Sequence, residues 1–124
     1  MRFMLDSNIV IAVTAALDRT VARRIEEYGE GDLVISAVTY AEVALGSVSG
    51  KHPSLSGLQA FVEQVPVLPF DDRAAWAYAS LPFRRGSFDR LIAAHALSQE
   101  LTLVTYNDRD FADVPGLVVE NWTL

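Results

Sequence analysis

Several acidic residues of this 124-residue chain stand where an apolar run ends or a helical pattern begins: Asp6, Glu42, Asp89, Asp108 and Asp110. Asp6 directly follows the apolar run at residues 3–5, which is typical of a buried strand. Open α/β sheets bind their ligands at the carboxyl ends of their strands. Asp6 therefore lies where such a sheet places a functional side chain.

The other acids are expected at the same edge of the sheet, because parallel strands share one carboxyl edge. Carboxylates gathered in one cleft repel one another unless a cation is present. Oxygen ligands in a chain without cysteine favour Mg²⁺ or Mn²⁺ over zinc. Such an ion activates water and stabilises charge on a phosphate, so metal-assisted phosphodiester hydrolysis is the predicted chemistry.

Each acid taken alone also has a structural explanation. Asp6 is a suitable cap for the helix that follows it, and Asp89 falls in a first helical turn, where the helix dipole stabilises a carboxylate. Glu42 lies beside an apolar stripe and either faces the site or reaches solvent. His95 is expected to be a hydrogen-bonded core histidine. Only the joint placement of the acids predicts a metal site.

Short apolar runs alternate with helical patterns along the chain, which predicts a parallel sheet covered by helices. The expected strands are residues 3–5, 33–35, 67–68, 101–105 and 117–119. The expected helices are residues 9–16, 20–28, 37–47, 58–64, 74–81 and 88–100, with a first strand extended to residue 13 as the alternative to the first helix. Prolines on both sides of residues 67–68 place that strand at an edge. The predicted fold class is α/β, a three-layer α/β/α arrangement around a parallel sheet of four or five strands, in one domain over residues 1–124.

Two segments carry more specific expectations. In the helix at residues 37–47, the spacing of Val38, Ala41 and Leu45 predicts the face that packs on the core, with Glu42 beside it. Residues 46–57 are rich in serine and glycine and are expected to form a flexible loop. Trp122 is expected to pack the carboxyl-terminal tail onto the domain.

Composition restricts the possible functions. The net charge of −6 argues against a nucleic-acid binder held by a broad basic surface. The absence of cysteine excludes disulfides and cysteine-based zinc sites. No apolar run is long enough to span a bilayer, and the first residues do not match a signal peptide. A cytoplasmic protein without membrane contact is expected.

Four blocks of the sequence, in order, resemble the conserved blocks of PIN domains. They are Leu5-Asp6-Ser7-Asn8-Ile9, the segment 35–42, the segment 88–96 and the segment 103–111, followed by Pro115-Gly116-Leu117 and Glu120-Asn121-Trp122. Four blocks together are far more specific than any one of them. The compact size and the ending resemble most closely the VapC-type toxins of bacterial toxin–antitoxin pairs.

This resemblance implies an endoribonuclease that depends on Mg²⁺ or Mn²⁺, is neutralised by a VapB-type antitoxin and forms a homodimer. By motif position, Asp6 and Asp89 are the expected metal ligands, and Glu42 completes the acidic trio. Ser7 and Thr105 are expected to support these acids by hydrogen bonds. The fourth catalytic position is expected at Asp110 rather than Asp108, although Asn107 stands where relatives carry either Asn or Asp. Phe88 replaces the Asn that often precedes the third-block aspartate.

The basic residues Arg84, Arg85, Arg90 and Lys51 are either contacts for RNA phosphates or solvated surface charges. The alternative function is a catalytically inactive PIN-like module that binds RNA or protein. A receiver-like signalling domain is disfavoured because it requires a lysine at the site, and Lys51, the only lysine, falls in a loop. A nucleophilic-aspartate phosphatase is disfavoured because Asn8 stands where it requires a second aspartate.

Overall fold

The fold is built around a five-stranded sheet in which every pairing is parallel, in the order β3-β2-β1-β4-β5. A computed structural model describes residues 1–29, 31–83 and 87–123. The strands are β1 (Phe3–Leu5), β2 (Leu33–Ser36), β3 (Val67–Leu68), β4 (Thr102–Val104) and β5 (Val119–Glu120). The central strand β1 pairs with β2 on one side and with β4 on the other. The predicted parallel sheet is confirmed, including the edge position of β3.

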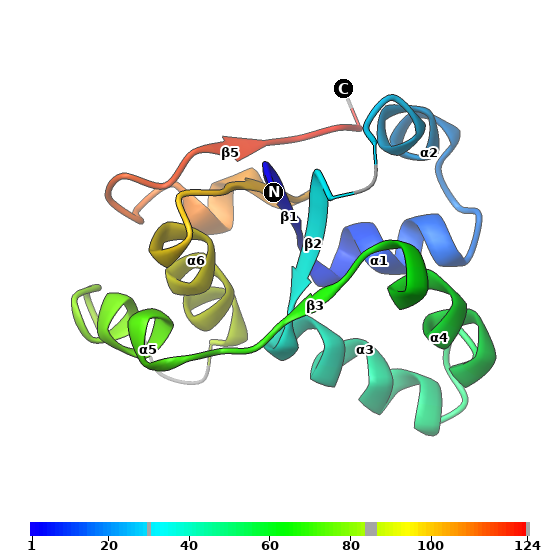
Figure 1. The fold of residues 1–124 in the computed structure, drawn as a ribbon, viewed down its shortest axis with the longest axis horizontal. Coiled ribbons are helices and arrows are strands. Elements are labelled where there is room, and N and C mark those ends of the chain that lie inside the picture. Colours follow the sequence, from blue (N-terminus) through cyan, green and yellow to red (C-terminus); the bar gives the residue numbers. More distant parts are fainter. Residues whose placement is uncertain (30, 84–86, 124) are drawn as a thin grey trace.

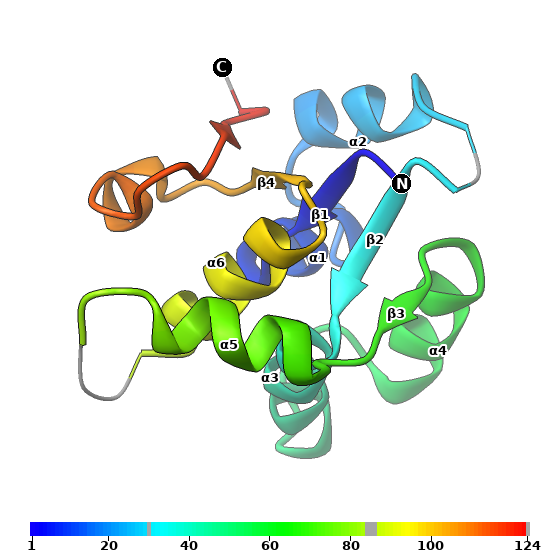
Figure 2. The same cartoon turned by 60° about the vertical axis from the view of Figure 1, so that its left-hand side comes forward.

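Helices cover both faces of this sheet, as Figures 1 and 2 show. They are α1 (Ser7–Thr14), α2 (Arg19–Glu26), α3 (Ala37–Val48), α4 (Leu55–Gln64), α5 (Asp72–Ala79) and α6 (Phe88–Ser98). A 3₁₀ turn, Asp108–Phe111, follows β4. Within the described residues, no helix is long and apolar enough to cross a membrane.

Alternation along the strands divides the core into two layers. Phe3, Leu5 and Ile35 pack with α1, α2, α3 and α4, whereas Met4 and Val34 pack with α6 on the opposite face. Successive side chains of a strand point to opposite faces, so each strand contributes to both layers. The predicted three-layer α/β/α arrangement is confirmed.

Side-chain caps fix where the helices begin. Asp6, Ser36, Asp71 and Ser87 each accept a hydrogen bond from a backbone N–H in the first turn of the helix that follows. The carboxylate of Asp18 accepts two such bonds at the start of α2. Caps satisfy N–H groups that have no partner inside a helix. The alternative of a first strand running to residue 13 is therefore wrong, because the cap at Asp6 begins α1.

Two expectations about α3 and the segment after it are wrong. Val38 packs on the core as predicted, but the buried residues of α3 are Thr39, Val43 and Ser47, whereas Ala41 is exposed and Leu45 is 68% exposed. The predicted loop at residues 46–57 is shorter than expected, because α3 continues to Val48 and α4 begins at Leu55. The hydroxyl of Ser47 donates to the Pro53 carbonyl and thereby closes the remaining connection.

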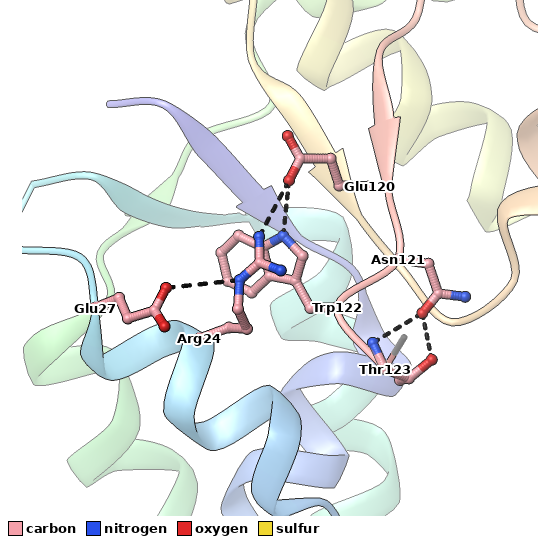
Figure 3. Close-up of polar contacts among 6 residues, drawn as sticks. All are labelled: Arg24, Glu27, Glu120, Asn121, Trp122 and Thr123. Carbon is pink, nitrogen blue, oxygen red and sulfur yellow. Dashed lines mark hydrogen bonds and ion pairs between the residues drawn. The ribbon is translucent and has the colours of Figure 1, made fainter.

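The carboxyl-terminal tail is held by an aromatic cluster. Trp122 is 1% exposed, and its ring stacks on Tyr28 with 5.2 Å between ring centroids. Arg24 of α2 lies 5.0 Å above the Trp122 ring, and Glu120 accepts a 2.9 Å hydrogen bond from the indole N–H (Figure 3). The predicted packing of the tail by Trp122 is confirmed, and this packing joins β5 to α2.

Two helices end in left-handed residues that are not glycine. After α6, the Leu101 N–H donates to the Ala96 carbonyl and the Glu100 N–H to the Leu97 carbonyl, which is the Schellman pattern. Glu100 has φ of 56°, and Ala16 occupies the same place after α1 with φ of 54°. A side chain at such a φ is strained, because its Cβ crowds the backbone.

We predict that Glu100→Gly stabilises the protein, because glycine adopts this φ without strain. The expected gain in the free energy of unfolding is about 1 kcal/mol, reduced by the greater freedom of glycine in the unfolded chain. Urea unfolding measures the gain. Gln99→Gly is the matched control, since residue 99 has a negative φ and should gain nothing. Equal effects at both positions would contradict the explanation.

Candidate active site

Asp6 is the most deeply buried acid of the site. It follows β1 directly, is 4% exposed and caps α1 by accepting a 2.8 Å hydrogen bond from the Ser7 N–H. Its other carboxylate oxygen accepts a 2.8 Å hydrogen bond from the hydroxyl of Thr105, which follows β4. The adjacent strands β1 and β4 thus place a carboxylate and its donor side by side.

Glu42 reaches the same place from α3. It is half-buried, and its carboxylate accepts a 2.7 Å hydrogen bond from the hydroxyl of Ser7. The predicted supporting hydrogen bonds from Ser7 and Thr105 are therefore present. Each neutral donor orients one acid and adds no positive charge.

Burial and the charges of neighbouring acids raise the pKa values of Asp6 and Asp89. Burial raises the pKa of Asp6 to about 6, against the lowering effect of the bonds from Thr105 and Ser7, and the charges of Asp89 and Glu42 add to the increase. Burial also raises the pKa of Asp89, with further increases from the charges of Asp110 and Glu42. These carboxylates are therefore close enough to repel one another.

The acids line a cleft of about 260 Å³ at the carboxyl edge of the sheet. We call it the acidic cleft. Its lining residues are Asp6, Ser7, Asn8, Ile11, Glu42, Asp89 and Asn107. The predicted acidic trio thus meets in one place.

The polar residues of the segment 103–111 contribute to the acidic cleft in different ways. Asn107 lines the acidic cleft, and its N–H donates a 3.1 Å hydrogen bond to the Thr105 hydroxyl. Asp110 lies outside the lining but acts on the pKa of Asp89 through its charge. Asp108, in the same 3₁₀ turn, neither lines the cleft nor acts on the pKa of Asp6 or Asp89. The assignment of the fourth position to Asp110 stays a prediction.

Asn8 also supports the site, a role that the sequence did not predict. Its side-chain amide donates to the Thr105 hydroxyl at 3.4 Å, and its carbonyl oxygen accepts from the Tyr106 N–H at 3.4 Å. Asn8 therefore links the start of α1 to the segment after β4. The only sequence signal for this role is its place two residues after Asp6.

The donor set suits a hard divalent cation. Carboxylate oxygens and neutral side chains surround the acidic cleft, and an uncompensated group of carboxylates attracts positive charge. Among residues 1–29, 31–83 and 87–123, no three acidic or histidine side chains already stand in a metal-binding arrangement. The acids thus line one cleft, but among the described residues no three of them lie close enough together to form a complete set of metal ligands.

Three other polar residues have clear places. His95 is 0% exposed, its Nδ1 lies 2.7 Å from the Ser36 hydroxyl, and burial lowers its pKa, so the prediction of a core histidine is confirmed. Arg90 is 4% exposed and pairs with Asp113 at 3.0 Å, so it is neither of the two predicted alternatives, an RNA contact or a solvated surface charge. Lys51 is exposed. Arg84 and Arg85 lie outside the described residues.

The family of the chain follows from its sequence. The family model of the PIN domain matches residues 3–117. The chain therefore belongs to the PIN domain family, and the resemblance of its four blocks to that family is confirmed.

Similarity to the VapC ribonucleases of this family extends over the whole chain. The chain is 33% identical to the tRNA(fMet)-specific endonuclease VapC of Shigella flexneri and 31% identical to Ribonuclease VapC1 of Haemophilus influenzae, with 99% of each chain covered in both alignments. Its fold matches VapBC2 of Rickettsia felis, solved bound to a DNA fragment from its promoter, with a TM-score of 0.84, 27% identity and coverage of 98% and 99%. DNA-bound VapBC of Salmonella typhimurium matches with a TM-score of 0.82, 28% identity and 98% coverage of both chains. The predicted resemblance to VapC-type toxin ribonucleases is confirmed.

We predict that Asp6→Asn stabilises the metal-free protein at neutral pH. The pKa of Asp6 is about 6 in the folded chain and near 3.8 in the unfolded chain, so the folded state binds the proton more tightly. The protonated Asp6 contributes fully to stability below pH 4, and this contribution is lost as the pH rises through 6. At about 1.4 kcal/mol per pKa unit, the total loss is about 3 kcal/mol. Asparagine keeps the cap without the charge.

Urea unfolding in EDTA at pH 7.5 and pH 4 measures this effect. The variant should be more stable than the wild type at pH 7.5, with the difference much smaller at pH 4. Asp18→Asn, which changes the cap of α2 away from the acidic cleft, is the matched control. A variant less stable than the wild type at pH 7.5 would show that the buried charge carries no net cost.

Proposed function

We propose that this protein is a VapC-type toxin that hydrolyses RNA phosphodiester bonds as an endoribonuclease dependent on Mg²⁺ or Mn²⁺. The observation that carries the proposal is the meeting of Asp6, Glu42 and Asp89 in one open cleft, where the charges of Asp89 and Glu42 raise the pKa of Asp6 and the charge of Glu42 raises the pKa of Asp89. Such a group of acids destabilises the metal-free fold. Selection for a bound cation explains why the chain keeps it.

In this proposal Asp6 and Asp89 hold the cation. A divalent ion there supplies positive charge for the phosphate and lowers the pKa of a bound water. Glu42, fixed by the Ser7 hydroxyl at 2.7 Å, orients the attacking water. Thr105 holds Asp6 in its position, and Asp110 adds negative charge near Asp89. The preorganised cleft thus holds the charged groups before the substrate arrives.

The partners we propose are an RNA substrate and a VapB-type antitoxin that neutralises the enzyme. VapBC complexes are among the solved structures with this fold, which supports the antitoxin proposal. We also propose that the chain forms a homodimer and acts in the cytoplasm, where RNA is available. Which RNA it cleaves, whether tRNA, rRNA or mRNA, is a question for the purified enzyme.

The alternative of an inactive PIN-like binding module requires that the acids serve stability alone. The raised pKa of Asp6 argues against it, because an ionised Asp6 at neutral pH opposes folding. A module without catalysis gains nothing from this charge. The retained acids therefore favour an enzyme.

We predict that Asp89→Asn abolishes divalent-dependent RNA cleavage while the protein stays folded. Asp89 is only half-buried, so the loss of its charge should not unfold the protein. We expect cleavage of total cellular RNA by the purified protein with Mg²⁺ to fall about 100-fold or more. EDTA should abolish cleavage by the wild type. Asp72→Asn, an exposed first-turn acid of α5, is the matched control. Undiminished cleavage by Asp89→Asn would exclude this site.

We further predict that Asp110→Asn slows cleavage and that Asp108→Asn does not. Both residues lie in the same exposed 3₁₀ turn, but only Asp110 acts on Asp89 through its charge. Rates measured over a range of Mg²⁺ concentrations should show that Asp110→Asn needs more metal for half-maximal activity. The reverse order of the two variants would assign the fourth position to Asp108.

A further inference from the structure

A second cleft of about 430 Å³ opens beside the acidic cleft, and we call it the flanking cleft. Ile11 and Glu42 line both clefts, so the two are adjacent. The side chains that distinguish the flanking cleft are Leu45, Lys51, His52 and Phe88. A substrate seated at the acids therefore lies next to the flanking cleft.

Phe88 is an exposed aromatic ring next to the site. It is the first residue of α6, directly precedes Asp89 and is 57% exposed. It takes no part in the two core layers, and among the described residues its ring contacts no other aromatic ring. Its ring is therefore available to a ligand.

Lys51 brings positive charge to the same cleft. It is the only lysine of the chain, it is exposed, and it makes no ion pair with any described residue. Arg90, by contrast, is buried and paired with Asp113. In a protein of net charge −6, a free cation beside an acidic cleft is placed to attract a phosphate.

We propose that the flanking cleft binds the nucleotide next to the scissile phosphate of an RNA substrate. The base stacks on Phe88, and the phosphate of that nucleotide pairs with Lys51. An aromatic platform beside a cation is the arrangement by which proteins bind single-stranded nucleic acid. The proposal rests on the proposed ribonuclease function, because the acidic cleft fixes where the scissile phosphate lies.

The cation beside the exposed ring favours RNA over a protein as the occupant of the flanking cleft. A protein partner that covered Phe88 through apolar contacts alone would leave Lys51 without a counter-charge. A more apolar groove shares Glu42, Leu45 and Phe88 with the flanking cleft, but it has no lysine or arginine in its lining. Among the three clefts that Glu42 lines, the flanking cleft alone combines the ring of Phe88 with a cation.

The test of the ring is the affinity of Phe88→Ala for a fluorescein-labelled single-stranded RNA 12-mer of mixed sequence. Fluorescence anisotropy with Ca²⁺ in place of Mg²⁺ measures binding by the full chain without cleavage. We expect binding about 5- to 100-fold weaker than that of the wild type, and near wild-type binding by Phe88→Trp. Trp76→Ala, which removes a 75% exposed ring outside the cleft, is the matched control and should bind normally.

The test of the cation is the salt dependence of the same binding. Lys51→Gln should lower the slope of log affinity against log salt concentration by about 0.7, because one fewer phosphate contact forms. Arg19→Gln, at the exposed start of α2, is the matched control and should leave the slope unchanged. An unchanged slope for Lys51→Gln would overturn the role of Lys51.

Stacking itself has a spectroscopic signature. In a Trp76→Phe background, Phe88→Trp leaves the buried Trp122 as the only other indole, so RNA addition should quench the new exposed fluorophore. No quenching, or a Phe88→Ala variant that binds as the wild type does, would overturn the proposal. So would a Phe88→Ala variant that turns a wild-type dimer into a monomer in sedimentation while each subunit binds RNA normally, because Phe88 would then serve a protein interface.

Failure of this proposal is distinguishable from failure of the proposed function. If the wild type cleaves RNA with Mg²⁺ but Phe88→Ala and Lys51→Gln bind as the wild type does, only the flanking cleft is wrongly assigned. If the wild type neither binds the 12-mer nor cleaves total cellular RNA, the ribonuclease function and the flanking cleft fall together.

Discussion

Repulsion among carboxylates is the constraint on which the arrangement of this protein depends. Asp6 is buried, and the charges of Glu42 and Asp89 both oppose its ionisation. The ion pairs within the described residues involve none of these three acids, and the groups that hold Asp6 and Glu42 are hydroxyls and a backbone N–H group. Neutral donors fix the direction of a carboxylate without cancelling its charge. The charge of Asp6 therefore stays uncompensated, at a cost to the stability of the metal-free fold.

The fold supplies what holds these charges together. The strand order places β1 between β2 and β4, so the segments that follow these strands meet at one edge. Two of the acids also serve the helices: Asp6 caps α1, and Asp89 lies in the first turn of α6, where the helix dipole favours negative charge. The structural and functional explanations of these acids are thus compatible. The amino-terminal ends of α1 and α6 thus stabilise the negative charges of Asp6 and Asp89.

The sequence was sufficient to predict the sheet, most helices and the meeting of Asp6, Glu42 and Asp89, because caps and short apolar runs are local signals. It was insufficient where the answer depends on contacts between distant segments. Arg90 is buried because it meets Asp113, and no local signal near Arg90 indicates this pair. Helical spacing identified an apolar stripe on α3, but spacing alone does not tell whether another element packs on it. Ala41 and Leu45 of this stripe are exposed. The same limit leaves the fourth acid to an experiment, since the turn after β4 offers two aspartates.

The wrong prediction on α3 and the exposed ring of Phe88 at the start of α6 are informative because they fall in one place. The buried side of α3 carries Thr39 and Ser47, while Leu45 on the opposite side faces the flanking cleft. Phe88 likewise carries a large ring that the core does not use. Natural sequences agree with their fold at most positions and depart from it mainly where function requires another side chain. Two such departures line one cleft beside the acids, which supports the proposal that this cleft binds a ligand.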